Sequence, residues 1–362
     1  MSEVTLDQAT VNEAMATAVD ASEAARGRTS PNPPVGAVVL DASGNVVGVG
    51  STRPPGGPHA EVVALQRAGA AARGGTAVVT LEPCNHTGRT GPCSRALIEA
   101  GIARVVYAVA DPNPLAEGGA RALAEAGVRV EAGVGADRVE RGPLRAWLHK
   151  QRTGRPLITL KYAASLDGRS AAADGTSQWI TGPDAREHVH TQRAKLDAIV
   201  VGTGTVLADD PLLTARFPDG SDAPHQPVRV VVGLREIPAD ARIRNATAPT
   251  VFLRTREVQT VVAALADHTE VLVEGGPQLA GAFLAAGMVD RIVAYIAPVV
   301  LGSGTSALEN AGVGTIADAL RFSIESVEPI GSDIVISAVP APPKDLAPPK
   351  DLAPPKDVAP AK

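Results

Sequence analysis

The two cysteines of this 362-residue chain constrain its fold more than any other feature. Both lie in one stretch, Cys84 after Pro83 and Cys93 after Pro92, and His59 precedes them. One imidazole and two thiolates make three ligands for a tetrahedral Zn²⁺ and leave the fourth position to water. An open position of this kind indicates a zinc that activates water, whereas a structural zinc is closed by four protein ligands. The fold must therefore bring residues 59, 84 and 93 together.

Three other interpretations of these residues are open. The cysteines could be inert buried thiols, because free cysteine is often buried. A disulfide is disfavoured, because the N-terminus Met1-Ser2-Glu3 lacks the regions of a signal peptide and the rest of the chain avoids cysteine. His86 could replace His59 as the nitrogen ligand, but only His59 is followed two residues later by a glutamate, Glu61.

Apolar periodicity around these residues predicts alternating helices and strands. The expected helices are residues 6–26, 58–67 and 93–100, and the expected strands are residues 35–40, 46–50, 76–81 and 105–109. A hairpin turn at residues 41–45 joins the first two strands, and Cys84 follows the third closely. This alternation predicts a layered α/β sandwich.

These motifs carry a resemblance. His59-Ala60-Glu61 and Pro83-Cys84 match the H-x-E…P-C signature of zinc-dependent nucleobase deaminases, in which the glutamate moves protons and is not a ligand. The eight residues between Cys84 and Cys93 exceed the short spacing of that signature. With residues 30–36, 81–90 and 111–114, the chain resembles the riboflavin-biosynthesis bifunctional deaminase–reductase family. The resemblance implies zinc on His59, Cys84 and Cys93, proton transfer by Glu61, and a contact from Asn32 to the pyrimidine.

The second half resembles the NADPH-dependent reductase of the same family, which is similar in fold to dihydrofolate reductase. The match runs through residues 157–169, 177–181, 204–216, 273–277 and 301–304. The substrate contacts that it implies are Lys161, Ser177, Arg193, Asp209, Leu213, Arg216 and Glu274. The cofactor contacts that it implies are Ala163, Trp179, Thr205, Asp209, Gly275 and Gly276. At Gly233-Leu234 the chain departs from the aspartate-serine pair of the family, so no cofactor contact is assigned to Leu234.

The chemistry of several of these residues favours the same roles independently of the resemblance. Arg193 and Arg216 could form bidentate hydrogen bonds with a phosphate. Gly275 and Gly276 follow an apolar run, and glycine there lets the backbone approach a pyrophosphate. Gly202 and Gly204 lack the third glycine of a dinucleotide fingerprint, since position 207 is Leu207, which argues against a Rossmann domain.

The expected organisation is a cytidine-deaminase-like three-layer sandwich at residues 1–150, a dihydrofolate-reductase-like α/β domain at 151–339 and a disordered tail at 340–362. The tail repeats Ala-Pro-Pro-Lys-Asp-Leu, which favours an extended polyproline-like segment. The resemblance implies zinc-dependent hydrolytic deamination of 2,5-diamino-6-(5-phosphoribosylamino)pyrimidin-4(3H)-one. NADPH then reduces 5-amino-6-(5-phosphoribosylamino)uracil to its ribityl product.

Two alternatives to this bifunctional enzyme are a deaminase whose C-terminal domain reduces nothing and a zinc-stabilised binding protein. The net charge of −5 argues against a nucleic-acid partner. No apolar run reaches the length of a membrane span. We expect a cytoplasmic homo-oligomer that acts on a small phosphorylated pyrimidine.

Overall fold

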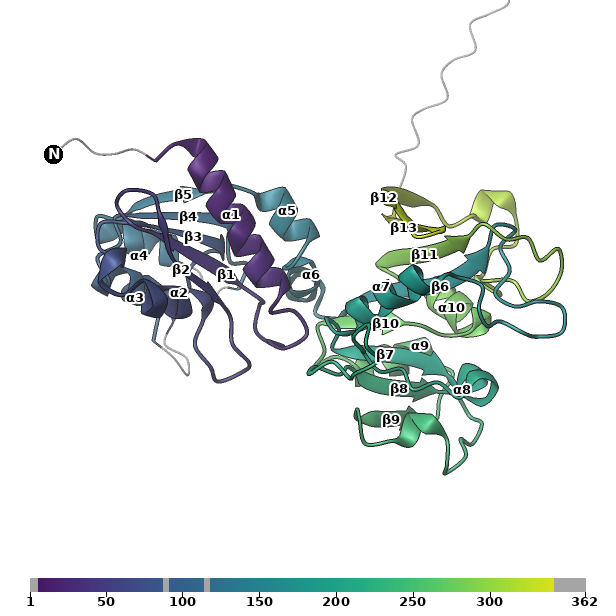
Figure 1. Ribbon diagram of the computed structural model, residues 1–362. Coiled ribbons are helices and arrows are strands. Elements are labelled where there is room, and N and C mark those ends of the chain that lie inside the picture. The colour runs from purple at the N-terminus through teal and green to yellow at the C-terminus, as the bar shows by residue number, and fades with distance from the viewer. Residues whose placement is uncertain (1–5, 87–90, 114–117, 342–362) are drawn as a thin grey trace, which may run out of the picture.

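The computed structural model describes residues 6–86, 91–113 and 118–341, which form two α/β domains side by side (Figure 1). Some segments used in the sequence analysis lie outside the described residues: residues 87–90 of the cysteine stretch, Pro114 of the motif at residues 111–114, and the repeats from residue 342 onward. Among the described helices, none has the length and apolarity needed to cross a membrane.

The first domain is built around a five-stranded sheet of order β2-β1-β3-β4-β5. β1 is antiparallel to β2 and β3, whereas β3, β4 and β5 are parallel. The strands are β1 (Gly36–Leu40), β2 (Val46–Ser51), β3 (Thr76–Leu81), β4 (Arg104–Val109) and β5 (Arg129–Ala132). The helices are α1 (Gln8–Glu23), α2 (Ala60–Ala68), α3 (Cys93–Glu99), α4 (Gly119–Glu125), α5 (Ala136–Arg141) and α6 (Arg145–Thr153).

Two glycines show that helices cover both faces of this sheet. A Cβ atom on Gly36 would lie 1.9 Å from the carbonyl oxygen of Ala18 in α1. One on Gly50 would lie 2.2 Å from the carbonyl oxygen of Ala60 in α2. Gly50 pairs with Ala37, the neighbour of Gly36, and successive residues of a strand face opposite sides. α1 and α2 therefore pack on opposite faces, and the predicted three-layer sandwich is confirmed.

The second domain contains an eight-stranded sheet of order β12-β13-β11-β6-β10-β7-β8-β9. The strands from β11 through the edge strand β9 are parallel, and β12 and β13 form an antiparallel pair at the opposite edge. The strands are β6 (Leu157–Ser165), β7 (Ala198–Gly202), β8 (Val228–Val232), β9 (Thr250–Leu253), β10 (Glu270–Val273), β11 (Arg291–Ala297), β12 (Phe322–Ile330) and β13 (Asp333–Pro340). The helices are α7 (Pro183–Arg193), α8 (Thr203–Asp209), α9 (Val258–Ala264) and α10 (Pro277–Ala285).

Apolar side chains from alternate positions of the strands form a core on each face of this second sheet. Val261 of α9 and Phe283 of α10 pack with Val271 and Val273 on one face. On the other face, Val189 of α7 packs with Tyr295, and Val206 of α8 packs with Ile199. The carboxyl ends of β6, β7, β8 and β10 therefore meet at one edge between two helical layers, where α/β proteins commonly bind ligands.

Helix α6 leads from the first domain into the second (Figure 1). The boundary expected between residues 150 and 151 falls inside this helix. Gly154, with a φ of 74°, ends the helix in the left-handed conformation that glycine adopts readily. Residues 154–156 thus connect α6 to β6.

Candidate active sites

Sheet register brings the zinc-ligand candidates to one edge of the first domain. Gly36 at the start of β1 pairs with Ser51 at the end of β2, and Ala37 pairs with Val79 near the end of β3. The loops that follow β2 and β3 therefore emerge together. His59 lies at the end of the first loop as the N-cap of α2, and Cys84 lies on the second.

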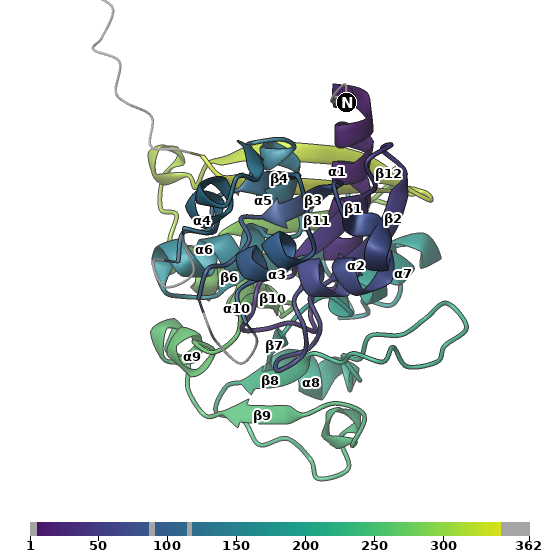
Figure 2. The same ribbon diagram turned by 90° about the vertical axis from the view of Figure 1, so that its left-hand side faces the viewer.

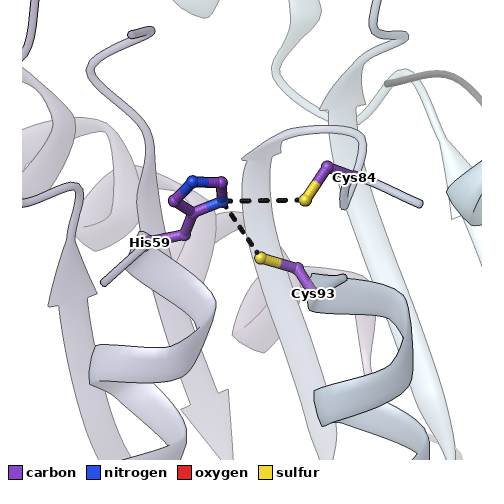
Figure 3. Close-up of side chains that lie close together, drawn as sticks. All are labelled: His59, Cys84 and Cys93. Carbon is purple, nitrogen blue, oxygen red and sulfur yellow. Dashed lines mark hydrogen bonds between the residues drawn. The ribbon is translucent and has the colours of Figure 1, made fainter. Parts of the chain in front are cut away.

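His59, Cys84 and Cys93 form one compact group (Figure 3). His59 Nδ1 lies 3.6 Å from Cys84 Sγ and 3.3 Å from Cys93 Sγ. Zinc bonds of about 2.0–2.1 Å to nitrogen and about 2.3 Å to sulfur place tetrahedral ligand atoms roughly 3.6 Å apart. The group therefore fits a zinc ion. Both cysteines are free thiols, which excludes the disulfide interpretation, and exposed His86 is not part of the group.

The ionisation of the two sulfurs also suits a cation. A hydrogen bond from the Cys93 thiol, assisted by His59, lowers the pKa of Cys84 to about 4. The same hydrogen bond, together with burial, raises the pKa of Cys93. The two sulfurs thus compete for one negative charge, and a divalent cation between them lets both be thiolates.

Glu61 is a buried carboxyl group in the first turn of α2, with 4% of its surface exposed. It does not belong to the His–Cys–Cys group. Burial, reinforced by the charge of Cys84, raises its pKa to about 7. A carboxyl group that titrates near neutral pH can both accept and donate a proton, which is what a proton shuttle requires.

In the second domain, Glu274 is the centre of a buried ion-pair cluster at the carboxyl edge of the sheet. Its carboxylate accepts a hydrogen bond of 3.1 Å from Lys161 Nζ in β6. It also accepts bonds of 3.0 and 2.8 Å from Nε and Nη2 of Arg193 at the end of α7. Burial by itself would raise the pKa of Glu274, but the charges of Arg193 and Lys161 outweigh burial and hold that pKa at about 2.

Arg193 and Arg216 lie near each other but differ in the partners of their guanidinium groups. Arg193 uses its remaining Nη1 on the carbonyl oxygen of Thr214, so its nitrogens are all engaged with protein acceptors. Arg216 is half-buried, and its Nη2 lies 3.3 Å from Nε2 of His190. Of the two arginines, Arg216 therefore has more hydrogen-bonding capacity left for a phosphate.

The cofactor residues expected from the sequence lie at the same edge of the sheet. Gly275 and Gly276 follow β10, and Gly276 is the N-cap of α10. A Cβ atom on Gly276 would lie 3.1 Å from Oγ1 of Thr205 in α8, so these two expected cofactor contacts are adjacent. Asp209 is the last residue of α8. Ala163 lies in β6, two residues after Lys161.

Ser177, Trp179 and Leu213 lie outside the ion-pair cluster. Ser177 and Trp179 belong to the connection between β6 and α7, where Trp179 is 68% exposed and the Arg186 guanidinium stacks 4.6 Å from its ring centre. The Leu213 side chain is buried in the core beside Ile199. A substrate contact by Leu213 would therefore come from its backbone.

His190 and Arg235 also lie at this site, and the sequence did not indicate either as a candidate site residue. His190 Nδ1 lies 3.0 Å from the carbonyl oxygen of Thr214. Burial and the charges of Arg193 and Arg216 lower the pKa of His190 to about 4, so its neutral ring can donate to Thr214 and accept from Arg216. Nη2 of exposed Arg235 lies 2.6 Å from where a Cβ of Gly204 would be. The departure from the aspartate-serine pair of the family at Gly233-Leu234 was a signal for this position, because Arg235 is the next residue.

Comparisons with known proteins match both domains. The cytidine and deoxycytidylate deaminase zinc-binding region matches residues 8–109, and the RibD C-terminal domain matches residues 156–336. Riboflavin biosynthesis protein RibD of Mycobacterium tuberculosis H37Rv is 58% identical over 329 residues, which cover 91% of this chain and 97% of that protein.

Two solved structures resemble the whole chain. RibD of Acinetobacter baumannii is 36% identical with a TM-score of 0.83, covering 93% of this chain and 100% of that one. A diaminohydroxyphosphoribosylaminopyrimidine deaminase/5-amino-6-(5-phosphoribosylamino)uracil reductase of Thermotoga maritima is 31% identical with a TM-score of 0.84, covering 92% and 99%.

The fold and the two sites define a zinc-dependent deaminase joined to an NADPH-dependent reductase. The chain belongs to the RibD family of riboflavin biosynthesis proteins. It is a bifunctional enzyme, and the presence of the reductase domain argues against the deaminase-only alternative.

Proposed function

We propose that the first domain removes the 2-amino group of 2,5-diamino-6-(5-phosphoribosylamino)pyrimidin-4(3H)-one and that the second reduces the resulting 5-amino-6-(5-phosphoribosylamino)uracil. The observation that carries this proposal is the pairing of two different buried sites in one chain. One is a His–Cys–Cys group beside Glu61, and the other is the Lys161–Glu274–Arg193 cluster beside a glycine loop.

His59, Cys84 and Cys93 are the residues that would hold zinc, with Glu61 as the proton shuttle. Bound zinc supplies the Lewis acidity that makes water nucleophilic at neutral pH. Glu61 accepts the proton of the attacking water and delivers it to the leaving amino group. Asn32, on the loop that enters β1 at the same edge of the sheet, contacts the pyrimidine.

In the reductase, we assign the substrate to Lys161, Ser177, Arg193, Asp209, Leu213, Arg216 and Glu274. Bound NADPH supplies the hydride. The residues that would hold this cofactor are Ala163, Trp179, Thr205, Asp209, Gly275 and Gly276. Arg235 offers a cation for its 2′-phosphate. His190 orients Arg216 towards the phosphate of the substrate, while Glu274 fixes the ammonium of Lys161.

The metal assignment is tested by replacing Cys84 or Cys93 with serine. A neutral hydroxyl is a much weaker zinc ligand than a thiolate, so we expect zinc content and ammonia release to fall together in each variant. NADPH oxidation with the deaminated substrate should be unchanged, because the reductase site contains neither cysteine. Metal analysis and both assays on the same preparation check this, and a serine variant with full zinc content would exclude that cysteine as a ligand.

We further propose that this enzyme works in the cytoplasm as a homo-oligomer, with the two domains meeting near residue 150. Support for self-association comes from β12, an edge strand of the larger sheet, where Ile324 is 66% and Val327 55% exposed. Exposed apolar side chains on an edge strand favour pairing with another chain. Sedimentation analysis should give at least twice the chain mass, and Ile324→Lys should lower it; a monomeric wild type would contradict this proposal.

A further inference from the structure

The segment that carries Asn32 connects α1 to β1, and we call residues 26–34 the substrate loop. Because Gly36 pairs with Ser51 and Ala37 with Val79, this loop enters the sheet at the edge where His59 and Cys84 lie. In both ribbon views the loop below α1 reaches the second domain near β7 and β10 (Figures 1 and 2). The substrate loop of one domain thus touches the other domain.

Two side chains of the substrate loop bind the second domain directly. Nη2 of Arg26 donates to both carboxylate oxygens of Glu270 at 2.8 Å, and both side chains are about seven-eighths buried. Ser30 Oγ donates to Asp197 Oδ2 at 2.9 Å and lies 3.2 Å from Thr269 Oγ1. Charge-assisted hydrogen bonds of this kind are stronger than neutral ones.

The acceptors on the second domain are themselves rigidly placed. Asp197 Oδ2 also accepts hydrogen bonds from the backbone N–H groups of Thr269 and Glu270, at 2.7 and 3.0 Å. Asp197 immediately precedes β7, and Glu270 begins β10, so both residues sit at the amino ends of central strands. The loop is therefore bound to the amino ends of two central strands of the reductase sheet.

Gly27 brings the loop backbone against the second domain. Its φ is 76°, and a Cβ atom there would lie 2.9 Å from the carbonyl carbon of Lys195 and 3.0 Å from the ring of His225. Beside this contact, a cleft of about 770 Å³ opens between the domains, lined among others by Arg28, Lys150 and His225. The polar contacts of Arg26 and Ser30 and the close backbone approach at Gly27 therefore connect the loop to the second domain.

We propose that the reductase domain holds the substrate loop of the deaminase in its working conformation, through Glu270 on Arg26 and Asp197 on Ser30. Deamination then depends on residues of the other domain, although none of them touches the zinc group. Reduction does not depend on these contacts, because Glu270 and Asp197 lie at the opposite ends of their strands from Glu274 and Thr205.

The test uses Glu270→Gln and Ser30→Ala in the full chain. Loss of a buried charge-assisted hydrogen bond typically weakens a site by about tenfold or more, so we expect the KM for the diaminopyrimidine to rise by about tenfold. Zinc content and NADPH oxidation with the deaminated substrate should stay at wild-type values. The unchanged reductase serves as an internal measure of folding in each preparation.

Glu325→Gln is the matched control. Glu325 in β12 forms an ion pair across the same domain junction with Arg145 of α6, but its side chain is more exposed than that of Glu270 and the pair does not touch the substrate loop. We expect Glu325→Gln to leave both activities unchanged. If Glu270→Gln and Ser30→Ala behave like Glu325→Gln, the proposal is wrong. If Glu270→Gln also impairs reduction, the milder Ser30→Ala decides between a specific effect and misfolding.

Because this proposal rests on the pyrimidine contact proposed for Asn32, that contact is tested separately with Asn32→Ala. An unchanged KM for the diaminopyrimidine in Asn32→Ala would remove Asn32 from the site. A raised KM in Glu270→Gln and Ser30→Ala would still show that the second domain positions the loop. A raised KM in Asn32→Ala alone would keep the contact and contradict the role of the reductase domain.

Discussion

Glu61→Gln should abolish deamination while leaving one zinc per chain. The amide has nearly the shape of the carboxyl group but cannot take a proton from water and return it to the amine. Positioned acid–base groups typically contribute about 10²–10⁴-fold, so kcat for ammonia release should fall by about 10³-fold. Zinc content should be unaffected, because Glu61 does not belong to the His–Cys–Cys group. Ammonia release and metal analysis on the same preparation check both.

Glu82→Gln provides a matched control in the same domain. Glu82 is also a buried carboxylate, and its two oxygens accept hydrogen bonds of 3.3 and 2.9 Å from the backbone N–H groups of Asp111 and Ala120. The amide oxygen of glutamine can still accept the shorter of these two bonds. We expect this variant to keep zinc and most of the deaminase activity. Loss of zinc in Glu61→Gln would make Glu61 a ligand, and full activity would exclude it as the proton shuttle.

Arg193→Ala should destroy NADPH oxidation and destabilise the second domain. The substitution leaves the buried carboxylate of Glu274 with Lys161 as its remaining charged partner. Removing one partner of a buried ion pair costs about 3–5 kcal/mol, which would appear as a lower free energy of unfolding. Deamination by folded protein should persist. Chemical denaturation and NADPH oxidation are the measurements.

The double variant Arg193→Met, Glu274→Gln separates stability from activity. It removes the charges of the Arg193–Glu274 pair and leaves Lys161 with a neutral acceptor in place of the carboxylate, so part of the lost stability should return, while NADPH oxidation should not. Arg193→Ala with normal stability and a normal reaction rate would show that the ion pair has no role.

The acid dependence of stability follows from the same cluster. The pKa of Glu274 is about 2 in the folded protein and lies below the ordinary value of 4.5, because Arg193 and Lys161 outweigh its burial. Its stabilising contribution is therefore fully present above pH 4.5 and is lost as the pH falls from 4.5 towards 2. We expect Glu274→Gln to remove this part of the acid sensitivity.

The zinc group was predictable because its ligands and Glu61 lie in short motifs of the sequence. His59, Glu61, Cys84 and Cys93 have few chemical alternatives as a set, and the structure places the three ligands together as expected. The strand at residues 76–81 matches β3 because an apolar run with clear ends leaves little choice of register. The helix expected at residues 6–26 ends earlier, at Glu23, and Arg26 beyond it binds the other domain instead.

Contacts between distant residues were not predictable in the same way. Arg193 and Glu274 are 81 positions apart, and no pattern in either segment shows that one is the partner of the other. The sequence equally could not show that the Leu213 side chain enters the core, because its positive φ of 51° depends on the packing of the loop. Such features depend on tertiary structure, which residue patterns do not record.

We expect the two sites of this chain to work separately and in a fixed order. The direct measurement is NADPH oxidation and ammonia release by the purified full chain, with each pyrimidine, before and after treatment with a zinc chelator. We expect the chelator to abolish ammonia release and to leave NADPH oxidation with the deaminated uracil unchanged. The diamino compound should support NADPH oxidation only when zinc is present, after a lag for deamination. Equal NADPH oxidation with both pyrimidines in the chelated enzyme, or none with either in the zinc-replete enzyme, would contradict this order of the two reactions.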